Sequence, residues 1–227
     1  MTPSDSIYRR SLAWAFFGIC LLLAIEPANR AHWAAENVFV VGLAMGLWLG
    51  RRVFTLSRLS FTLVFVFLCL HEVGAHYTYA AVPYEGWLEA LTGTTLRARF
   101  GLERNHYDRL VHFAFGLLMT WPMREVLVQT SPVRGRWSYL LPVALAMAAA
   151  MAYEVAEWLA VAFVAEEGQG SAYLGMQGDM WDAQKDMALG AAGAMLAMTI
   201  AVNLAPARRR AAAYPRDGQA SRSAAGA

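Results

Sequence analysis

The apolar segment Ser60–Ala75 has the sequence SFTLVFVFLCLHEVGA and contains a polar pair, His71 and Glu72, near its end. A helix needs about 20 residues, at about 1.5 Å of rise each, to cross the roughly 30 Å of hydrocarbon in a bilayer. With its flanking residues this segment is long enough to do so. Ionisable side chains within such helices are energetically costly, and they usually face the interior of a helix bundle. The segment therefore predicts a membrane helix with a polar end.

The composition of the whole chain agrees with this prediction. Hydrophobic residues make up 58% of its 227 residues and charged residues 16%, whereas soluble domains average about 45–50% and about 25%. With a mean hydropathy of +0.35, a soluble monomer would lack the polar surface to cover itself. The two cysteines are too few for a disulfide scaffold, and the apolar content excludes intrinsic disorder. The chain is therefore expected to be a polytopic membrane protein.

Five further apolar runs accompany the first and set the expected architecture. The run at Val38–Leu49 is short, so we expect its helix to include His32–Asn37 as well. We predict an all-α transmembrane bundle of about six spans, which forms one domain over residues 11–204 between an N-terminal segment at 1–10 and a disordered basic tail at 205–227. The six runs are Ser11–Ile25, Val38–Leu49, Ser60–Ala75, Leu110–Val128, Tyr139–Val164 and Ala183–Leu204.

Lysine and arginine residues set the expected orientation, because cytoplasmic loops of membrane proteins carry an excess of them. If both termini are cytoplasmic, thirteen of the 19 basic residues lie inside and six outside. We therefore expect both termini in the cytoplasm and an outer loop at Tyr77–Asp108, in which Pro83 can begin a short helix on the membrane surface. The alternative is a loop packed over the helix ends. Because topology explains the basic residues, nucleic-acid binding has no support.

Ten acidic and histidine residues collect at the expected outer ends of four predicted helices. Residues three or four positions apart share a helix face, and the ten include such pairs on the fourth, fifth and sixth predicted helices. The convergence is the main functional signal in the sequence. The ten are His71, Glu72, His76, Asp108, His112, Glu154, Glu157, Asp179, Asp182 and Asp186, and the pairs are Asp108 with His112, Glu154 with Glu157, and Asp182 with Asp186.

This cluster suggests a metal centre. Facing carboxylates repel one another, and a divalent metal held by carboxylates and imidazoles would remove the repulsion. Pairing of the acidic residues with the neighbouring Arg109 and Lys185 is the alternative. In a metal-assisted reaction Glu154 or Glu157 would serve as the general base. We expect His32 in an exposed loop. The predicted metal ligands are His76, Asp108, His112, Asp179, Asp182 and Asp186.

Four motifs occur in order along nearly the whole chain apart from the tail. They are HYTYAAVP at 76–83, NHYDRLVHF at 105–113, YEVAEW at 153–158 and GMQGDMWDAQKDM at 175–187. Together they resemble the YjdF-like family of bacterial inner-membrane proteins, in which proline takes the place of His106. The resemblance implies a small multi-pass inner-membrane protein and, since the family is uncharacterised, no established activity. A weaker likeness to VanZ-like membrane proteins, carried by Asp108, Arg109 and His112, implies a role at the cell envelope.

Three functions stay open for the cluster. In an enzyme, a metal at the outer leaflet would activate water or polarise a lipid-linked or envelope substrate. In a proton-coupled transporter, the acidic and histidine residues would relay protons, although carriers usually place their sites at the membrane midplane. In a non-catalytic protein, the cluster would be a structural polar network within the lipid bilayer. The sequence specifies neither the metal, nor the substrate, nor the oligomeric state.

Overall fold

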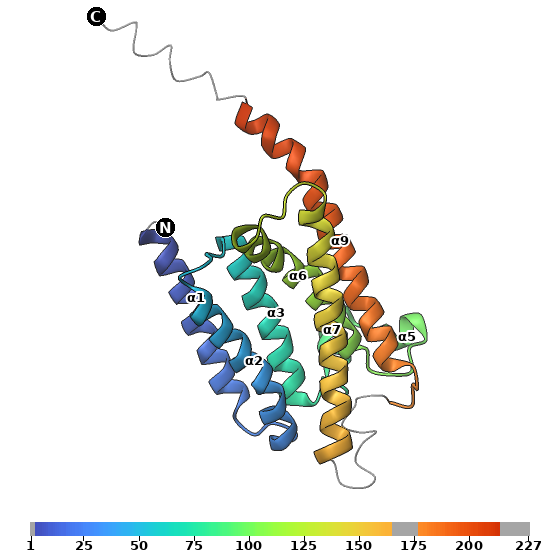
Figure 1. Ribbon diagram of the computed structural model, residues 1–227. Helices are drawn as coiled ribbons and strands as arrows, with labels where there is room; N and C mark the ends of the chain where they lie inside the picture. The colour runs from blue at the N-terminus through green and yellow to red at the C-terminus, as the bar shows by residue number, and fades with distance from the viewer. Residues whose placement is uncertain (1–2, 165–176, 214–227) are drawn as a thin grey trace, which may run out of the picture.

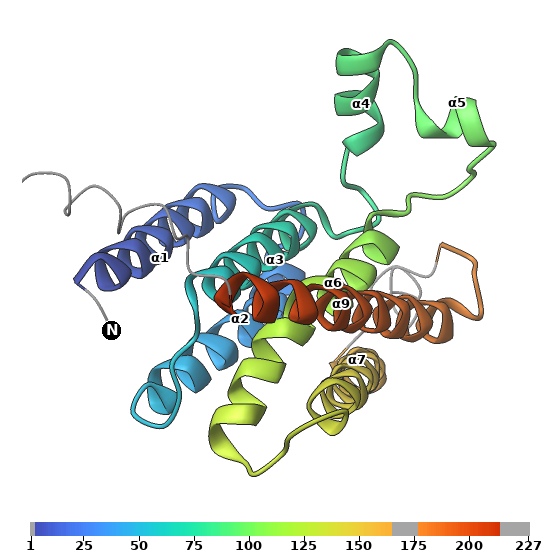
Figure 2. The same cartoon turned by 90° about the horizontal axis from the view of Figure 1, so that it is seen from above.

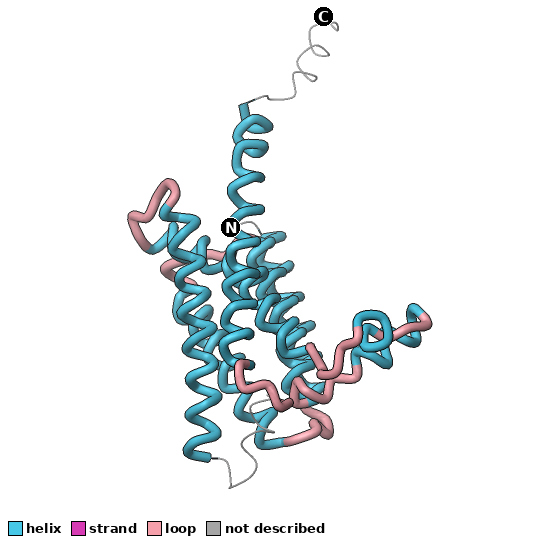
Figure 3. Tube along the Cα trace, turned by 90° about the vertical axis from the view of Figure 1, so that its right-hand side faces the viewer, coloured by secondary structure: helices cyan, strands magenta, loops and turns pink. Residues whose placement is uncertain are grey.

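The computed structural model describes residues 3–164 and 177–213, and this part of the chain consists of helices and their connections (Figure 3). It contains eight helices and no strand within those residues. The helices are α1 (Pro3–Leu23), α2 (Arg30–Gly50), α3 (Arg58–Tyr77), α4 (Tyr84–Thr92), α5 (Leu96–Phe100), α6 (Tyr107–Thr130), α7 (Trp137–Val164) and α9 (Asp182–Ala213).

The six long helices run alongside one another as a bundle with α6 in the middle (Figure 1 and Figure 2). Helix α6 packs against α3, α7 and α9, while α1 and α2 pack against α3. Five of the long helices are long and apolar enough to cross a membrane; α6, of 24 residues, is the more polar one. Each predicted apolar run largely coincides with one long helix. The structure thus confirms an all-α polytopic bundle, whereas the cytoplasmic location of both termini stays a prediction.

Helix α2 begins eight residues before the apolar run that predicted it. The side chain of Asn29 accepts a hydrogen bond from the backbone N–H of His32 at 3.0 Å and so caps the first turn. The expectation that the helix includes His32–Asn37 is confirmed. The expectation of an exposed His32 is wrong, because the earlier start places this residue inside the helix, where it is 6% exposed.

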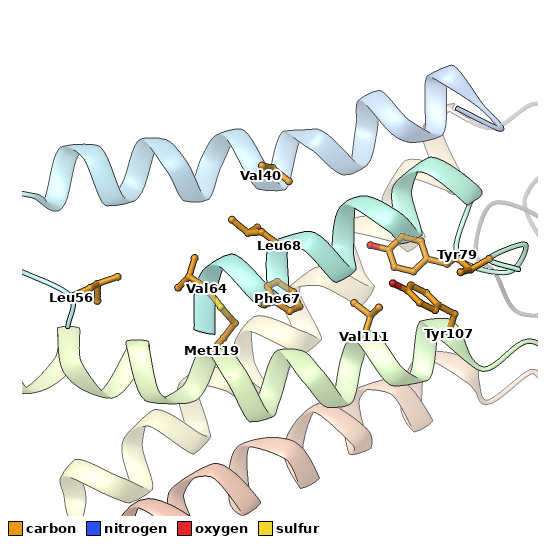
Figure 4. Close-up of a cluster of buried hydrophobic side chains, with 10 residues drawn as sticks. Val40, Leu56, Val64, Phe67, Leu68, Tyr79, Tyr107, Val111 and Met119 are labelled. Atoms are coloured by element: carbon orange, nitrogen blue, oxygen red, sulfur yellow. The ribbon is translucent and has the colours of Figure 1, made fainter. Parts of the chain in front are cut away.

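The main apolar core lies between α2, α3 and α6 (Figure 4). Phe67 on α3 and Met119 and Val111 on α6 belong to it. Toward the end of α3 the core becomes aromatic, with the ring centroids of Tyr79 and Tyr107 6.4 Å apart. This apolar layer fixes α3 against α6 directly beside the polar side chains at the same end of the bundle.

Two features lie outside the bundle. Helix α4 begins directly after Pro83, as the sequence predicts, and α4 and α5 project to one side (Figure 2). A position on the membrane surface stays a prediction for them. Helix α9 continues past Leu204 to Ala213. The disorder and location of the predicted tail are untested, and its residues 214–227 lie outside the described residues.

Candidate functional site

Side chains from three helices meet near the beginning of α6. Asp108 and His112, one turn apart on α6, and Asp186 on α9 can each offer one ligand atom, and these atoms all lie within 4.8 Å of one another. Glu154 on α7 adds a fourth group, with its Oε1 3.3 Å from Nε2 of His112. Asp108 Oδ1 lies 3.5 Å from the same nitrogen. We call these four residues the carboxylate–histidine cluster.

The protein itself satisfies this cluster poorly. Asp186 is only 2% exposed, yet its Oδ1 has no hydrogen-bond partner among the described residues. The same holds for Oε1 of Glu154. Removing a carboxylate from water without a compensating partner costs several kcal/mol. Oxygen and imidazole donors that converge in this way fit a divalent cation, so three of the six predicted ligands come together in a group that could hold one.

Two other predicted ligands, Asp179 and Asp182, form ion pairs instead. The guanidinium of Arg104 donates to both carboxylate oxygens of Asp182, at 2.5 and 3.0 Å. Arg109 and Lys185 both donate to Oδ2 of Asp179, at 2.6 and 2.5 Å, and do not pair with the glutamates of α7. The hydrogen bond from Lys185 lowers the pKa of Asp179 to about 2. We call these five residues the arginine–aspartate network, and they largely neutralise one another.

The sixth predicted ligand, His76, lies at the end of α3. Its Nδ1–H donates to the backbone carbonyl of Leu23 at 2.8 Å, and its own carbonyl accepts from the N–H of Ala28 at 2.8 Å. These bonds fasten the α1–α2 connection to α3. His76 is outside the group of described residues that could hold a metal.

A cavity of about 520 Å³ opens beside the cluster, between α2, α3, α6 and α7. Asp108 and His112 belong both to its wall and to the cluster. The remaining polar wall residues lie on α2, α3 and α7 and in the turn that follows α3. They are Glu36, His71, Tyr79, Tyr153 and Glu157.

Hydrogen bonds order most of this polar wall. Tyr153 donates from its hydroxyl to Oε2 of Glu36 at 2.6 Å. Tyr79 donates to Nδ1 of His71 at 2.7 Å, which leaves Nε2–H of His71 to donate to the Glu36 carbonyl at 3.3 Å. Glu157, a predicted general base, makes no hydrogen bond or ion pair with any residue that the structure describes. The wall therefore keeps one carboxyl group available to a ligand.

Glu36, which is 5% exposed, is not among the site residues predicted from the sequence. Its Oε1 lies 3.6 Å from Nε2 of His32, one helical turn earlier. The four-residue spacing of these two is the same as that of Asp108 and His112, and it could have identified the pair. Both residues precede the apolar run at Val38–Leu49, in the polar part that the predicted helix includes.

Comparisons with known proteins agree with the helical membrane architecture. The family described as "Predicted membrane protein (DUF2238)" matches residues 8–206. The chain is 35% identical over 179 residues to the inner membrane protein YjdF of Escherichia coli (strain K12), an alignment covering 78% of this chain and 80% of that protein. No solved structure matches the chain. The resemblance to YjdF and the inner-membrane location are confirmed. The chain is a multi-pass protein of the bacterial inner membrane and belongs to the DUF2238 family.

Proposed function

We propose that this protein is a membrane enzyme that uses a divalent cation, held by Asp108, His112 and Asp186, to act on a lipid-linked or envelope substrate at the outer face of the membrane. The observation that carries the proposal is the convergence of these three side chains, with a buried carboxylate oxygen of Asp186 that has no hydrogen-bond partner in the part of the chain that the structure describes. A cation between the carboxylates would remove their mutual repulsion.

The proposal assigns different roles to the two predicted general bases. A metal held by carboxylates and imidazole can lower the pKa of a bound water and polarise a substrate oxygen. Glu154 is the better placed base, because its Oε1 lies 3.3 Å from His112 within the cluster. Glu157 lines the cavity and is better placed to contact a substrate.

The location of the ionisable groups favours an enzyme over a carrier. The cluster and the arginine–aspartate network both lie at the end of the bundle where α6 and α9 begin. Carriers usually hold their substrates near the midplane, between discontinuous helices. A structural polar network is the remaining alternative, and it differs from the proposal in requiring no metal.

Elemental analysis of the protein purified in detergent tests the proposal. After incubation with Zn²⁺ or Mn²⁺ and removal of free ions, we expect about one divalent ion per chain in the wild type. Asp186→Asn and His112→Ala should lose it, because each removes a ligand. Asp182→Asn is the matched control, since it changes a buried aspartate one turn away that pairs with Arg104.

Two results would contradict the metal centre. One is a folded wild-type protein that takes up neither ion. This result would favour the structural network. The other is equal metal loss in Asp182→Asn and Asp186→Asn, which would mean that the ion depends on folding of this end of the bundle and not on the three ligands.

A further inference from the structure

The cavity beside the cluster has two chemically different ends. At the beginning of α6 its wall carries Glu36, Asp108 and Glu157, and farther along α6 it carries Met119 and Met123. The 15 residues from Asp108 to Met123 advance by roughly 22 Å along the helix. This is more than half of the roughly 30 Å hydrocarbon layer. The cavity therefore combines a short polar part with a long apolar part that extends into the depth of the membrane.

The cavity also opens toward the side of the bundle. Ala35 and Val38 on α2 and Ala152 and Ala156 on α7 line it and are exposed on the bundle surface. Helices α2 and α7 therefore both contribute to this side of the cavity wall. In the membrane this surface faces lipid, so an apolar molecule can enter from the bilayer without crossing water. The small alanine side chains leave the entrance on the α7 side unobstructed.

The polar end of the cavity is acidic in composition. None of the described residues that line the cavity is lysine or arginine, whereas three are carboxylic acids. Carboxylates accept hydrogen bonds and repel anions. Glu157 has no hydrogen-bond partner of its own among the described residues, and Glu36 uses one oxygen to accept from Tyr153. A head that donates hydrogen bonds, through hydroxyl or ammonium groups, is complementary to this wall.

We propose that the cavity binds a single-chain amphiphile from the bilayer, with its hydrocarbon chain between α2, α6 and α7 and a hydrogen-bond-donating head against Glu36 and Glu157. A volume of about 520 Å³ suits one small ligand, which favours one chain over the two of a bilayer lipid. This inference deepens the proposed function and rests on it for the role of the amphiphile as substrate, because the head would lie beside Asp108 and His112.

Photo-crosslinking of the purified full-length protein tests the inference. The probes are a monoacylglycerol, a long-chain alkylamine and a fatty acid of equal chain length, each with a diazirine in the chain. The two donor-headed probes should label residues that line the cavity on α6 and α7, and the fatty acid should label them about tenfold less. Mass spectrometry of the peptides locates the label.

Two neighbouring residues on α7 provide a matched pair of variants. Ala156→Phe places a ring in the entrance and should lower labelling by the donor-headed probes about tenfold. Val155→Phe adds a ring of similar size at an exposed position that does not line the cavity, and it should leave labelling unchanged. Both positions face lipid, so both variants should fold. Glu157→Gln should weaken labelling by the alkylamine more than labelling by the monoacylglycerol.

Three outcomes would overturn the inference: label spread evenly over the lipid-facing helices, equal labelling of the wild type and Ala156→Phe, or fatty-acid labelling as strong as that of the donor-headed probes. A failure of the metal proposal can be distinguished from a failure of the amphiphile proposal. If Asp186→Asn is labelled normally and wild type holds no metal, only the metal proposal fails. If wild type holds metal but takes no label in the cavity, only the amphiphile proposal fails.

Discussion

At the scale of single residues, Asp182 and Asp186 show how two similar side chains acquire opposite roles. Both are buried in the first turns of α9, one turn apart. Asp182 receives two hydrogen bonds from Arg104. Asp186 lies in a group of acidic and histidine side chains, and its Oδ1 has no hydrogen-bond partner among the residues described. Asp182 therefore forms an ion pair with Arg104, whereas Asp186 is one of the three residues that we propose as ligands of a cation.

Substitution of these two aspartates should have opposite effects on stability without metal. Asp182→Asn leaves the partly buried Arg104 without its main partner and should lower the free energy of unfolding by about 2 kcal/mol. Asp186→Asn removes one of three facing carboxyl groups and should be neutral or stabilising in the presence of a chelator. Thermal unfolding in detergent measures both. A large loss of stability in Asp186→Asn alone would contradict the assignment.

The arginine–aspartate network should weaken in acid. The hydrogen bond from Lys185 holds the pKa of Asp179 at about 2, below its ordinary 3.8. A lowered folded-state pKa gives stability that is present above about pH 4 and is lost as the pH falls toward 2. The advantage of wild type over Asp179→Asn in unfolding temperature should shrink over this range. An advantage that is constant down to pH 2 would contradict a role for the charged carboxylate.

At the scale of the helices, close packing of α6 against α9 brings the cluster together. A Cβ on Gly116 would collide with the backbone carbonyl of Gly190, and a Cβ on Gly193 would collide with that of Phe113. Small residues at helix interfaces in membranes allow such close backbone approach. Since Asp108 and His112 come from α6 and Asp186 from α9, the separation of these helices sets the distance between the predicted ligands.

Gly193→Ala tests this dependence. The added methyl group should push α9 away from α6, lower the free energy of unfolding by about 1–3 kcal/mol and weaken metal binding about tenfold. Gly42→Ala on α2 is the control, because a Cβ there meets nothing within 4 Å, and alanine has the higher helix propensity. Titration with Zn²⁺ and thermal unfolding measure the two effects. If Gly193→Ala is destabilised but binds Zn²⁺ with unchanged affinity, the packing of α6 against α9 does not set the geometry of the proposed ligands.

At the scale of the whole molecule, the order of the long helices determines which groups share a membrane face. Helices α1, α3 and α7 end at the same side of the bundle where α2, α6 and α9 begin (Figure 1). The cluster, the arginine–aspartate network and His76 all lie at this end. The distribution of basic residues predicts that this end is the outer one.

Reporter fusions test the orientation. At Gly93, between α4 and α5, only a reporter that is active outside the cytoplasm should give a signal. After Arg51, only a reporter that is active in the cytoplasm should give one. The two sites lie at opposite ends of the bundle, so they serve as controls for each other. Cytoplasmic activity at Gly93 would reverse the orientation and move the proposed site to the inner face.

The helical bundle could be predicted from the sequence because burial in lipid requires long apolar segments, and these are visible in the chain. The family could be recognised for a similar reason, since its motifs are continuous in the sequence. The candidate site was only partly predictable. The four-residue spacing on α6 predicted that Asp108 and His112 lie on one face. The same spacing on α9 could not predict that Asp182 forms an ion pair while Asp186 joins the cluster.

Only the tertiary structure decided which ionisable groups are neutralised and which are not. Arg104 belongs to an irregular connection, and no periodic pattern indicates that it reaches Asp182. Glu36 and Glu157 meet at one cavity although 121 positions separate them. The sequence by itself determined the membrane helices, because the hydrophobic effect acts on each segment locally. The three-dimensional packing determined the site, because charge pairing depends on distances between segments far apart in the chain.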